Sequence, residues 1–138
     1  MVSTIPDDIP NDGISLRFKY GPHTIFLFVD RVASFDAIST QLLAVLRERY
    51  PRGLLQGDPS LPGNTAVPPA GQACHIVYGL PRNPRDLVAG WRAVNVEGEN
   101  PTTLKLRQNA VLAFALETDS DPKPEFRVEI PTFDEEEP

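Results

Sequence analysis

Two strand-like runs, followed at once by a helix-like run, most constrain the fold of this chain. Residues 14–30 read ISLRFKYGPHTIFLFVD, so runs of β-forming residues flank a Gly-Pro-His turn. In the first run apolar residues alternate with polar ones, which is the period of a half-buried strand. The connection through residues 21–23 is short enough to join two antiparallel strands. The stretch therefore predicts a β-hairpin.

The second run of this hairpin is apolar on both of its sides. One set is Ile25, Leu27 and Val29, and the alternating set is Phe26 and Phe28. Successive side chains of a strand point to opposite faces, so one set is surplus to a core built on the other face. Contiguous exposed apolar surface is typical of an interface. The alternative is that the loop after the helix, or the segment EFRVEI (125–130), folds back and covers it.

An amphipathic helix of about four turns is predicted directly after the hairpin. Ser34 stands where an N-cap is expected, and Asp36 lies in the first turn, where negative charge favours the helix dipole. The apolar stripe at helical spacing is Phe35, Ile38, Leu42, Val45 and Leu46. Pro51 ends the helix because proline cannot continue it.

The rest of the chain predicts a loop, further strands and an acidic end. Pro and Gly recur so densely over residues 51–72 that we expect a long mobile loop there. Strands are expected at residues 73–78, 91–96 and 111–116. The predicted organisation is a disordered lead at 1–13, a domain at 14–117 and an acidic segment at 118–138. Hairpins with a single helix between them predict an α+β fold, with that helix packed across one face of a sheet.

The net charge of −6 is concentrated at the C-terminal end. From Glu117 onward nine acids face two basic residues, giving −7, whereas the first 116 residues hold eleven basic and ten acidic side chains, giving +1. An acidic end repels phosphate backbones and the body shows no dense Lys/Arg stripe, so nucleic-acid binding is not expected. The acidic segment instead predicts a protein partner with a basic surface, bound with salt-sensitive affinity.

Cysteine usage and hydropathy predict an intracellular protein of the cytoplasm or nucleus. Cys74 is the only cysteine and cannot form a disulfide within the chain, which agrees with a reducing compartment. No apolar run reaches the length of a membrane span, and the first residues lack the basic and apolar regions of a signal peptide. We therefore expect no membrane association.

The sequence offers little support for catalytic residues, a metal site or a cofactor. Cys74 and His75 are neighbours in a predicted strand and point to opposite faces, so they cannot form a nucleophile–base pair. His23 lies in the hairpin turn, and no spacing brings it to His75 as a metal ligand. Phosphate-binding and nucleophile-elbow motifs are absent. The alternative hypothesis is an enzyme or small-molecule binder that uses the 54–72 loop as a lid near His75.

The order of these elements resembles the ubiquitin-like β-grasp superfamily. The resemblance rests on the hairpin above, the helix SFDAISTQLLAVLRERY, the third-strand region HIVYGLPRNPRDLVAGW and the last strand region TLKLRQNAVLAFALE. It covers residues 14–117 and implies a mixed sheet of four to five strands with one main helix on one face. The chain departs from the family pattern in its long 51–72 loop and in its end FDEEEP, which lacks a terminal Gly-Gly. A divergent member or dedicated subunit is therefore expected, and the alternative of a conjugated modifier is weakened.

In β-grasp proteins the sheet face away from the helix is commonly the recognition face, so the resemblance implies protein recognition. We expect a non-enzymatic interaction module, an adaptor or subunit of a larger eukaryotic complex. The predicted partner-binding residues are Phe26, Phe28, Val77, Trp91, Phe126, Val128 and Ile130. Trp91 either anchors an interface or closes one end of the core. Residues 125–130 add a strand either to this sheet or to a partner's sheet.

Overall fold

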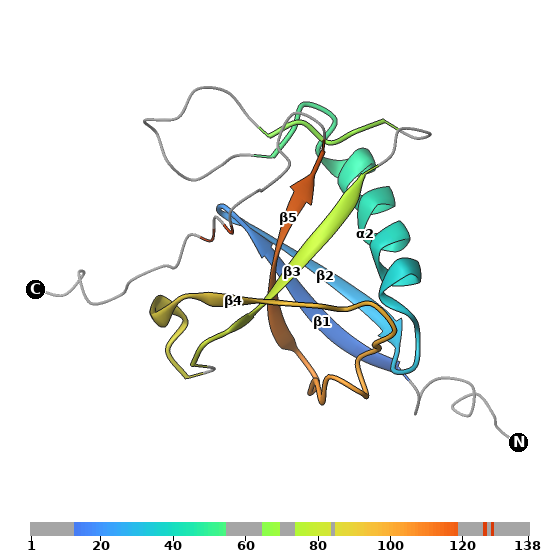
Figure 1. The fold of residues 1–138 in the computed structure, drawn as a ribbon. Helices are drawn as coiled ribbons and strands as arrows, with labels where there is room; N and C mark the ends of the chain where they lie inside the picture. Colours follow the sequence, from blue (N-terminus) through green and yellow to red (C-terminus); the bar gives the residue numbers. More distant parts are fainter. Residues whose placement is uncertain are drawn as a thin grey trace, which may run out of the picture.

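A mixed sheet of five strands with one α-helix across one face forms the described part of the chain (Figure 1). The computed structural model describes residues 13–54, 65–69, 74–83, 85–118, 126 and 128. The elements are β1 (Gly13–Tyr20), β2 (His23–Asp30), α2 (Phe35–Arg49), β3 (His75–Pro81), the 3₁₀ turn η1 (Leu87–Ala89), β4 (Trp91–Val94) and β5 (Ala110–Glu117). The predicted α+β class is confirmed.

The strand order is β2-β1-β5-β3-β4, with the N-terminal hairpin at one side of the sheet. The two central strands, β1 and β5, run parallel, and every other neighbouring pair is antiparallel. The predicted hairpin is confirmed: Tyr20 pairs with His23 across a turn of Gly21 and Pro22. Gly21 adopts a φ of 53°, a left-handed conformation that glycine reaches without strain.

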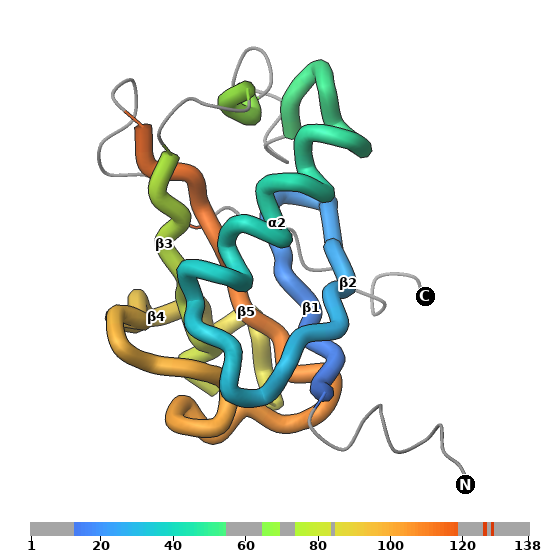
Figure 2. Tube along the Cα trace, turned by 90° about the vertical axis from the view of Figure 1, so that its right-hand side faces the viewer, coloured from blue at the N-terminus to red at the C-terminus, as the bar shows by residue number. Residues whose placement is uncertain are grey.

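Local signals set both ends of α2. Ser34 has extended backbone angles, and its hydroxyl accepts a hydrogen bond from the Ala37 N–H, which confirms the predicted N-cap. At the other end the Tyr50 N–H donates to the Leu46 carbonyl at 2.8 Å before Pro51 stops the helix. Figure 2 shows α2 lying in front of the strands, so that its apolar stripe faces the sheet.

The core lies between α2 and the sheet face that it covers, which we call the inner face. On β1 the alternation predicted from the sequence is confirmed, since every second residue is buried. The core residues of the hairpin and helix include Ile14, Leu16, Phe18, Tyr20, Ile25, Leu27, Val29, Phe35, Ile38, Leu42 and Leu46. Tyr78 of β3 joins them, with its ring centroid 5.8 Å from that of Phe18 and 5.1 Å from that of Phe35. Burial of this apolar area is the main stabilising contribution.

The described residues of the 51–72 loop contact the rest of the domain, and the mobility expected of this loop stays a prediction. Leu54 is fully buried, and it exchanges two backbone hydrogen bonds of 2.8 Å with Thr65. Arg47 of α2 donates from Nε to the Pro68 carbonyl at 2.8 Å. Leu54 is one of a few apolar residues scattered among prolines and glycines without periodicity, so the sequence did not reveal its burial. Residues 55–64 and 70–73 lie outside the described residues.

Two predicted strands have different limits. β3 begins at His75 and continues to Pro81, because Leu80 and Pro81 gain partners in Arg92 and Trp91 of β4. β4 ends at Val94, two residues early, because the Asn95 side chain accepts the Glu97 N–H at 3.0 Å and turns the chain. Of the predicted lead, only residue 13 is described, and it belongs to β1. Within the described residues, no helix is long and apolar enough to cross a membrane.

Candidate interaction surface

The hairpin presents two exposed phenylalanines on the outer face, the side of the sheet opposite α2. Phe26 is 61% exposed and Phe28 is 56% exposed, whereas Ile25, Leu27 and Val29 of the same strand are buried against the helix. Arg17 stands directly across from Phe26 on β1, and Ser15 across from Phe28. The alternation in the sequence predicted two apolar sides, and the position of α2 decides which of them is exposed.

The two phenylalanines differ in their support. The Phe28 ring lies over Gly13, where any side chain would overlap the ring. Gln41 of α2 donates from its side chain to the Phe28 carbonyl at 3.4 Å. Phe28 is thus held against its own strand pair, and Phe26 is the more open of the two rings. This difference makes Phe26 the better residue for testing a role of this face.

Part of the C-terminal segment folds back onto the same chain, one of the alternatives left open by the sequence. The Phe126 ring packs on Gly79 of β3 and against the edge of the core. Val128 forms a parallel bridge with Gly21, at the hairpin turn. Ile130 lies outside the described residues. For Phe126 and Val128, binding to a partner stays a prediction, because both contact their own domain.

Val77 and Trp91 occupy different positions in the sheet. Val77 points outward from β3, is half-buried and pairs with Ala115 of β5. Trp91 begins β4 opposite Pro81 and is half-buried, so it is not one of the buried core residues. Leu104 and Leu106 pack against the core, whereas Trp91 is not among the residues that do so. The interpretation that Trp91 plugs the core is therefore not supported.

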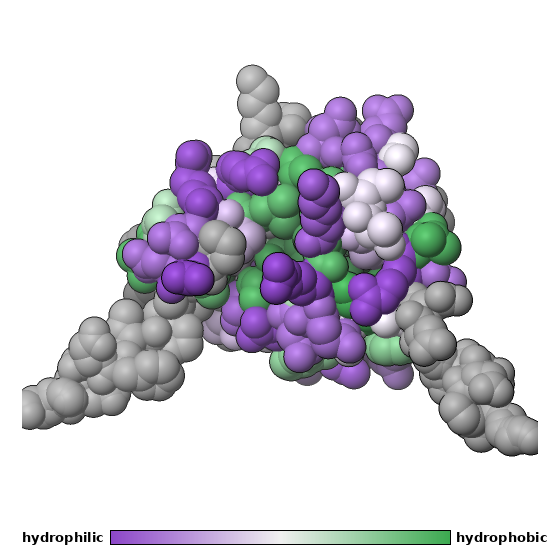
Figure 3. Space-filling view, turned by 90° about the horizontal axis from the view of Figure 1, so that it is seen from below, coloured by the Kyte–Doolittle hydropathy of each residue, from purple (hydrophilic) through white to green (hydrophobic). Residues whose placement is uncertain are grey.

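A second surface feature is a basic hollow at the end of the sheet where β3 ends and β5 begins. The cavity measures about 650 Å³, and its cations are Arg17, Arg85, Arg92, Lys105 and Arg107. Leu80, Leu87 and Leu104 are among its apolar residues. Figure 3 views this end of the molecule and shows hydrophobic surface in the middle, ringed by hydrophilic side chains. The sequence did not reveal the cluster, because its cations come from separate segments and form no stripe.

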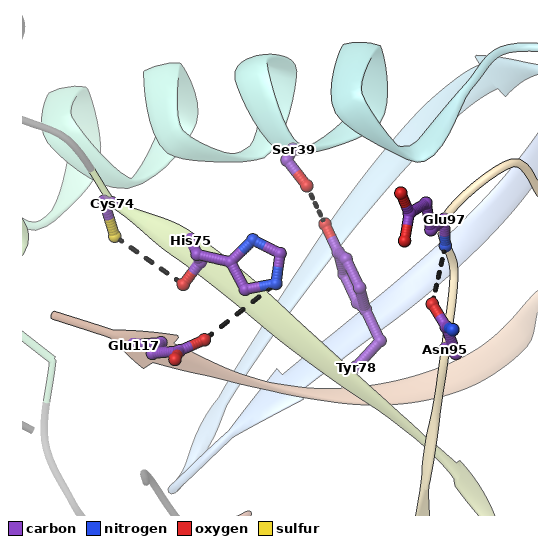
Figure 4. Close-up of polar contacts among 7 residues, drawn as sticks. All are labelled: Ser39, Cys74, His75, Tyr78, Asn95, Glu97 and Glu117. Carbon is purple, nitrogen blue, oxygen red and sulfur yellow. Dashed lines mark hydrogen bonds and ion pairs between the residues drawn. The ribbon is translucent and has the colours of Figure 1, made fainter. Parts of the chain in front are cut away.

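The polar groups near β3 do not form a nucleophile–base pair. Figure 4 shows the Cys74 thiol directed at the His75 carbonyl oxygen, at 3.9 Å, and not at the imidazole. Burial raises the pKa of the Cys74 thiol, although Arg47 opposes the effect, so the thiol stays protonated at neutral pH. A reactive cysteine needs the opposite shift. The His75 ring is mostly exposed, and its Nε2 lies 3.9 Å from a Glu117 carboxylate oxygen.

The polar residues near Cys74 and His75 also have structural roles. Tyr78, three residues after His75 on β3, shares a 2.7 Å hydrogen bond with the Ser39 hydroxyl of α2 (Figure 4). A groove of about 550 Å³ separates the first turn of α2 from the chain after β4. In the described part of the chain, no group of three His, Cys, Asp or Glu residues is placed to hold a metal ion. A lid formed by residues 54–72 stays a prediction, since most of that loop is outside the described residues.

Comparison with known proteins places the chain in no group: no protein-family model matches it, and no curated protein matches it.

Proposed function

We propose that this chain is a non-enzymatic protein-interaction module, an adaptor or subunit of a larger complex, which binds its partner through the outer face of the hairpin. The main support for this proposal is the exposure of Phe26 and Phe28 on a strand whose other side is buried in the core. Exposed aromatic rings that lie together are typical of interface anchors. The sheet order, with a parallel central pair and a helix after the first hairpin, is compatible with the ubiquitin-like β-grasp fold.

The surroundings of Phe26 indicate the chemistry of the partner. Arg17 lies across from it, and Lys19, which follows on the same face, donates to Thr24 at 2.8 Å. Burial lowers the pKa of Lys19, and the charge of the neighbouring Arg17 lowers it further, so these two cations interact on this face. A partner surface that offers an apolar pocket beside a carboxylate would satisfy both the ring and the guanidinium.

The test is quantitative affinity capture with the full chain, its Phe26→Ala variant and a matched Val32→Ala control. Val32 is 66% exposed and lies in the turn before α2, so its truncation removes exposed apolar area away from the outer face. We expect a defined set of proteins to be lost with Phe26→Ala and retained with Val32→Ala. For the purified partner, the loss is expected to be at least about tenfold in affinity.

Two outcomes would contradict the proposal. Equal capture by all three chains would exclude the hairpin face as the binding element. Equal loss with both variants would indicate a general effect of surface hydrophobicity. A chain that ends at Glu117 then tests whether the C-terminal segment contributes, since it removes Phe126 and Val128 together with the acidic residues.

A further inference from the structure

The basic hollow concentrates positive charge that the described protein does not neutralise. Its lining contains five Lys or Arg side chains and no Asp or Glu. Among the residues that the structure describes, no carboxylate is within ion-pair distance of these five cations. Arg17 is held at the rim, because its Nε donates to the Asn109 carbonyl at 3.0 Å. Such a cluster favours an anionic occupant with several charges.

The apolar residues of the hollow restrict that occupant further. Leu80, Leu104 and Leu106 line it and are only half-buried against the core, so their outer sides are free to take an apolar group. A simple anion would leave this surface uncovered. The described lining has no aromatic ring on which a nucleic-acid base could stack. The chemistry therefore fits an acidic peptide that carries an apolar side chain.

We propose that the occupant is the C-terminal heptapeptide of this same chain, TFDEEEP (132–138). It combines one aromatic residue, Phe133, with four consecutive acids, Asp134, Glu135, Glu136 and Glu137. Phe133 covers the leucines of the hollow, and the acids pair with the surrounding cations. The negative charge of the heptapeptide is thereby neutralised by cations of the same molecule. A partner that binds the basic hollow must first displace the heptapeptide.

The heptapeptide is close enough to reach the hollow. Val128, the last described residue, bridges Gly21. Arg17 of β1 precedes Gly21, in the hairpin turn, by four residues, a distance of about 13 Å along the chain. Phe133 follows Val128 by five residues, which can span about 17 Å. Single surface ion pairs are weak, but a short tether gives an effective concentration on the order of millimolar, so modest affinity suffices.

The experiment is paramagnetic relaxation enhancement on the full chain, with a nitroxide attached at Pro138→Cys in a Cys74→Ser background. We expect loss of amide signal intensity at Arg85, Arg92 and Arg107, and intact signals at His75 and Glu117, which pair at the opposite end of β3 and β5. Replacing the four acids by Asn and Gln should abolish that loss, and high salt should weaken it. Mixing spin-labelled chain with isotope-labelled chain that carries no nitroxide distinguishes the same chain from a second copy.

Three results would overturn the proposal: no signal loss at the hollow, signal loss there that survives neutralisation of the acids, or signal loss seen only in the mixed sample. A second measurement keeps Cys74 intact and compares amide shifts of the natural chain with those of the four-acid variant. Shifts at the hollow are expected, whereas the control pair Glu97→Gln and Glu99→Gln should leave the hollow unchanged. Shift changes confined to the substituted ends would also count against the proposal. These measurements do not involve Phe26, so they can fail while the proposed function holds.

Discussion

The inner and outer faces of the N-terminal hairpin are made from similar residues and have opposite environments. On the inner face, Phe18 and Ile25 are fully buried under α2. On the outer face, Phe26 is 61% exposed although it directly follows Ile25 in the chain. Within the part of the chain that the structure describes, Phe126 covers the outer face at Gly79. The position of the helix, and not the hydrophobicity of a residue, therefore decides which residues stabilise the fold and which are available for recognition.

Truncation of one ring on each face gives the largest expected contrast. Phe18→Ala removes a fully buried ring and should lower the free energy of unfolding by about 3–5 kcal/mol, since it leaves a cavity. Phe26→Ala should change it by less than about 0.5 kcal/mol. Chemical denaturation followed by circular dichroism measures both. If Phe18→Ala does not fold, Phe18→Leu provides a milder inner-face variant. Similar losses on both faces would mean that the outer face is covered in solution.

Removing the hydrogen bond between Tyr78 and Ser39 tests whether water reaches the inner face. Burial raises the pKa of the Tyr78 phenol well above its ordinary value, so the hydroxyl is neutral and depends on Ser39. Ser39→Ala should cost about 1–3 kcal/mol by leaving a buried hydroxyl unpaired. Adding Tyr78→Phe to that variant should restore most of the loss. A single Ser39→Ala variant as stable as the natural chain would show that water reaches Tyr78.

Gly79→Ala tests the covered part of the outer face. A Cβ at this position would lie 2.8 Å from the Phe126 ring, which must move away because it is the more adjustable group. We expect a cost of about 1 kcal/mol, at the low end for overpacking. In a Phe126→Ala background the same substitution should cost much less, and a double-mutant cycle measures the coupling. Equal costs in both backgrounds would argue against the contact.

The smallest expected effect is a pH dependence at the margin of the inner face. Burial lowers the pKa of His23 below its ordinary 6.5, next to the Tyr50 ring at 4.6 Å. The unfolded chain then binds a proton more readily, so stability falls as the pH drops through 6.5 towards the lower folded value. His23→Gln should remove this part of the dependence. Denaturation of the natural chain and of the His23→Gln variant at several pH values separates the contribution of His23 from the titration of carboxylates, which both chains share. Parallel pH profiles for the two chains would contradict the assignment.

Local patterns in the sequence were sufficient for the hairpin and the helix. The alternation in β1 and the Ser34 cap each depend on contacts within a few residues, and both are observed. The extension of β3 to Pro81 was missed because it depends on pairing with β4 across the sheet. The early end of β4 follows from a local turn at Asn95, which the sequence analysis did not identify. For the candidate surface, the sequence identified two apolar sides on β2, but it could not say which one the helix would cover.

By itself, the sequence determined the alternation of β1, the beginning and end of α2 and the acidity of the C-terminal end, because these properties depend on neighbouring residues and on composition. The tertiary structure alone decided the parallel pairing of β1 with β5, the burial of Leu54 and the gathering of five cations in one hollow. Those features join residues that are far apart in the chain. Their positions follow from packing one helix against one face of the sheet, which no local pattern encodes.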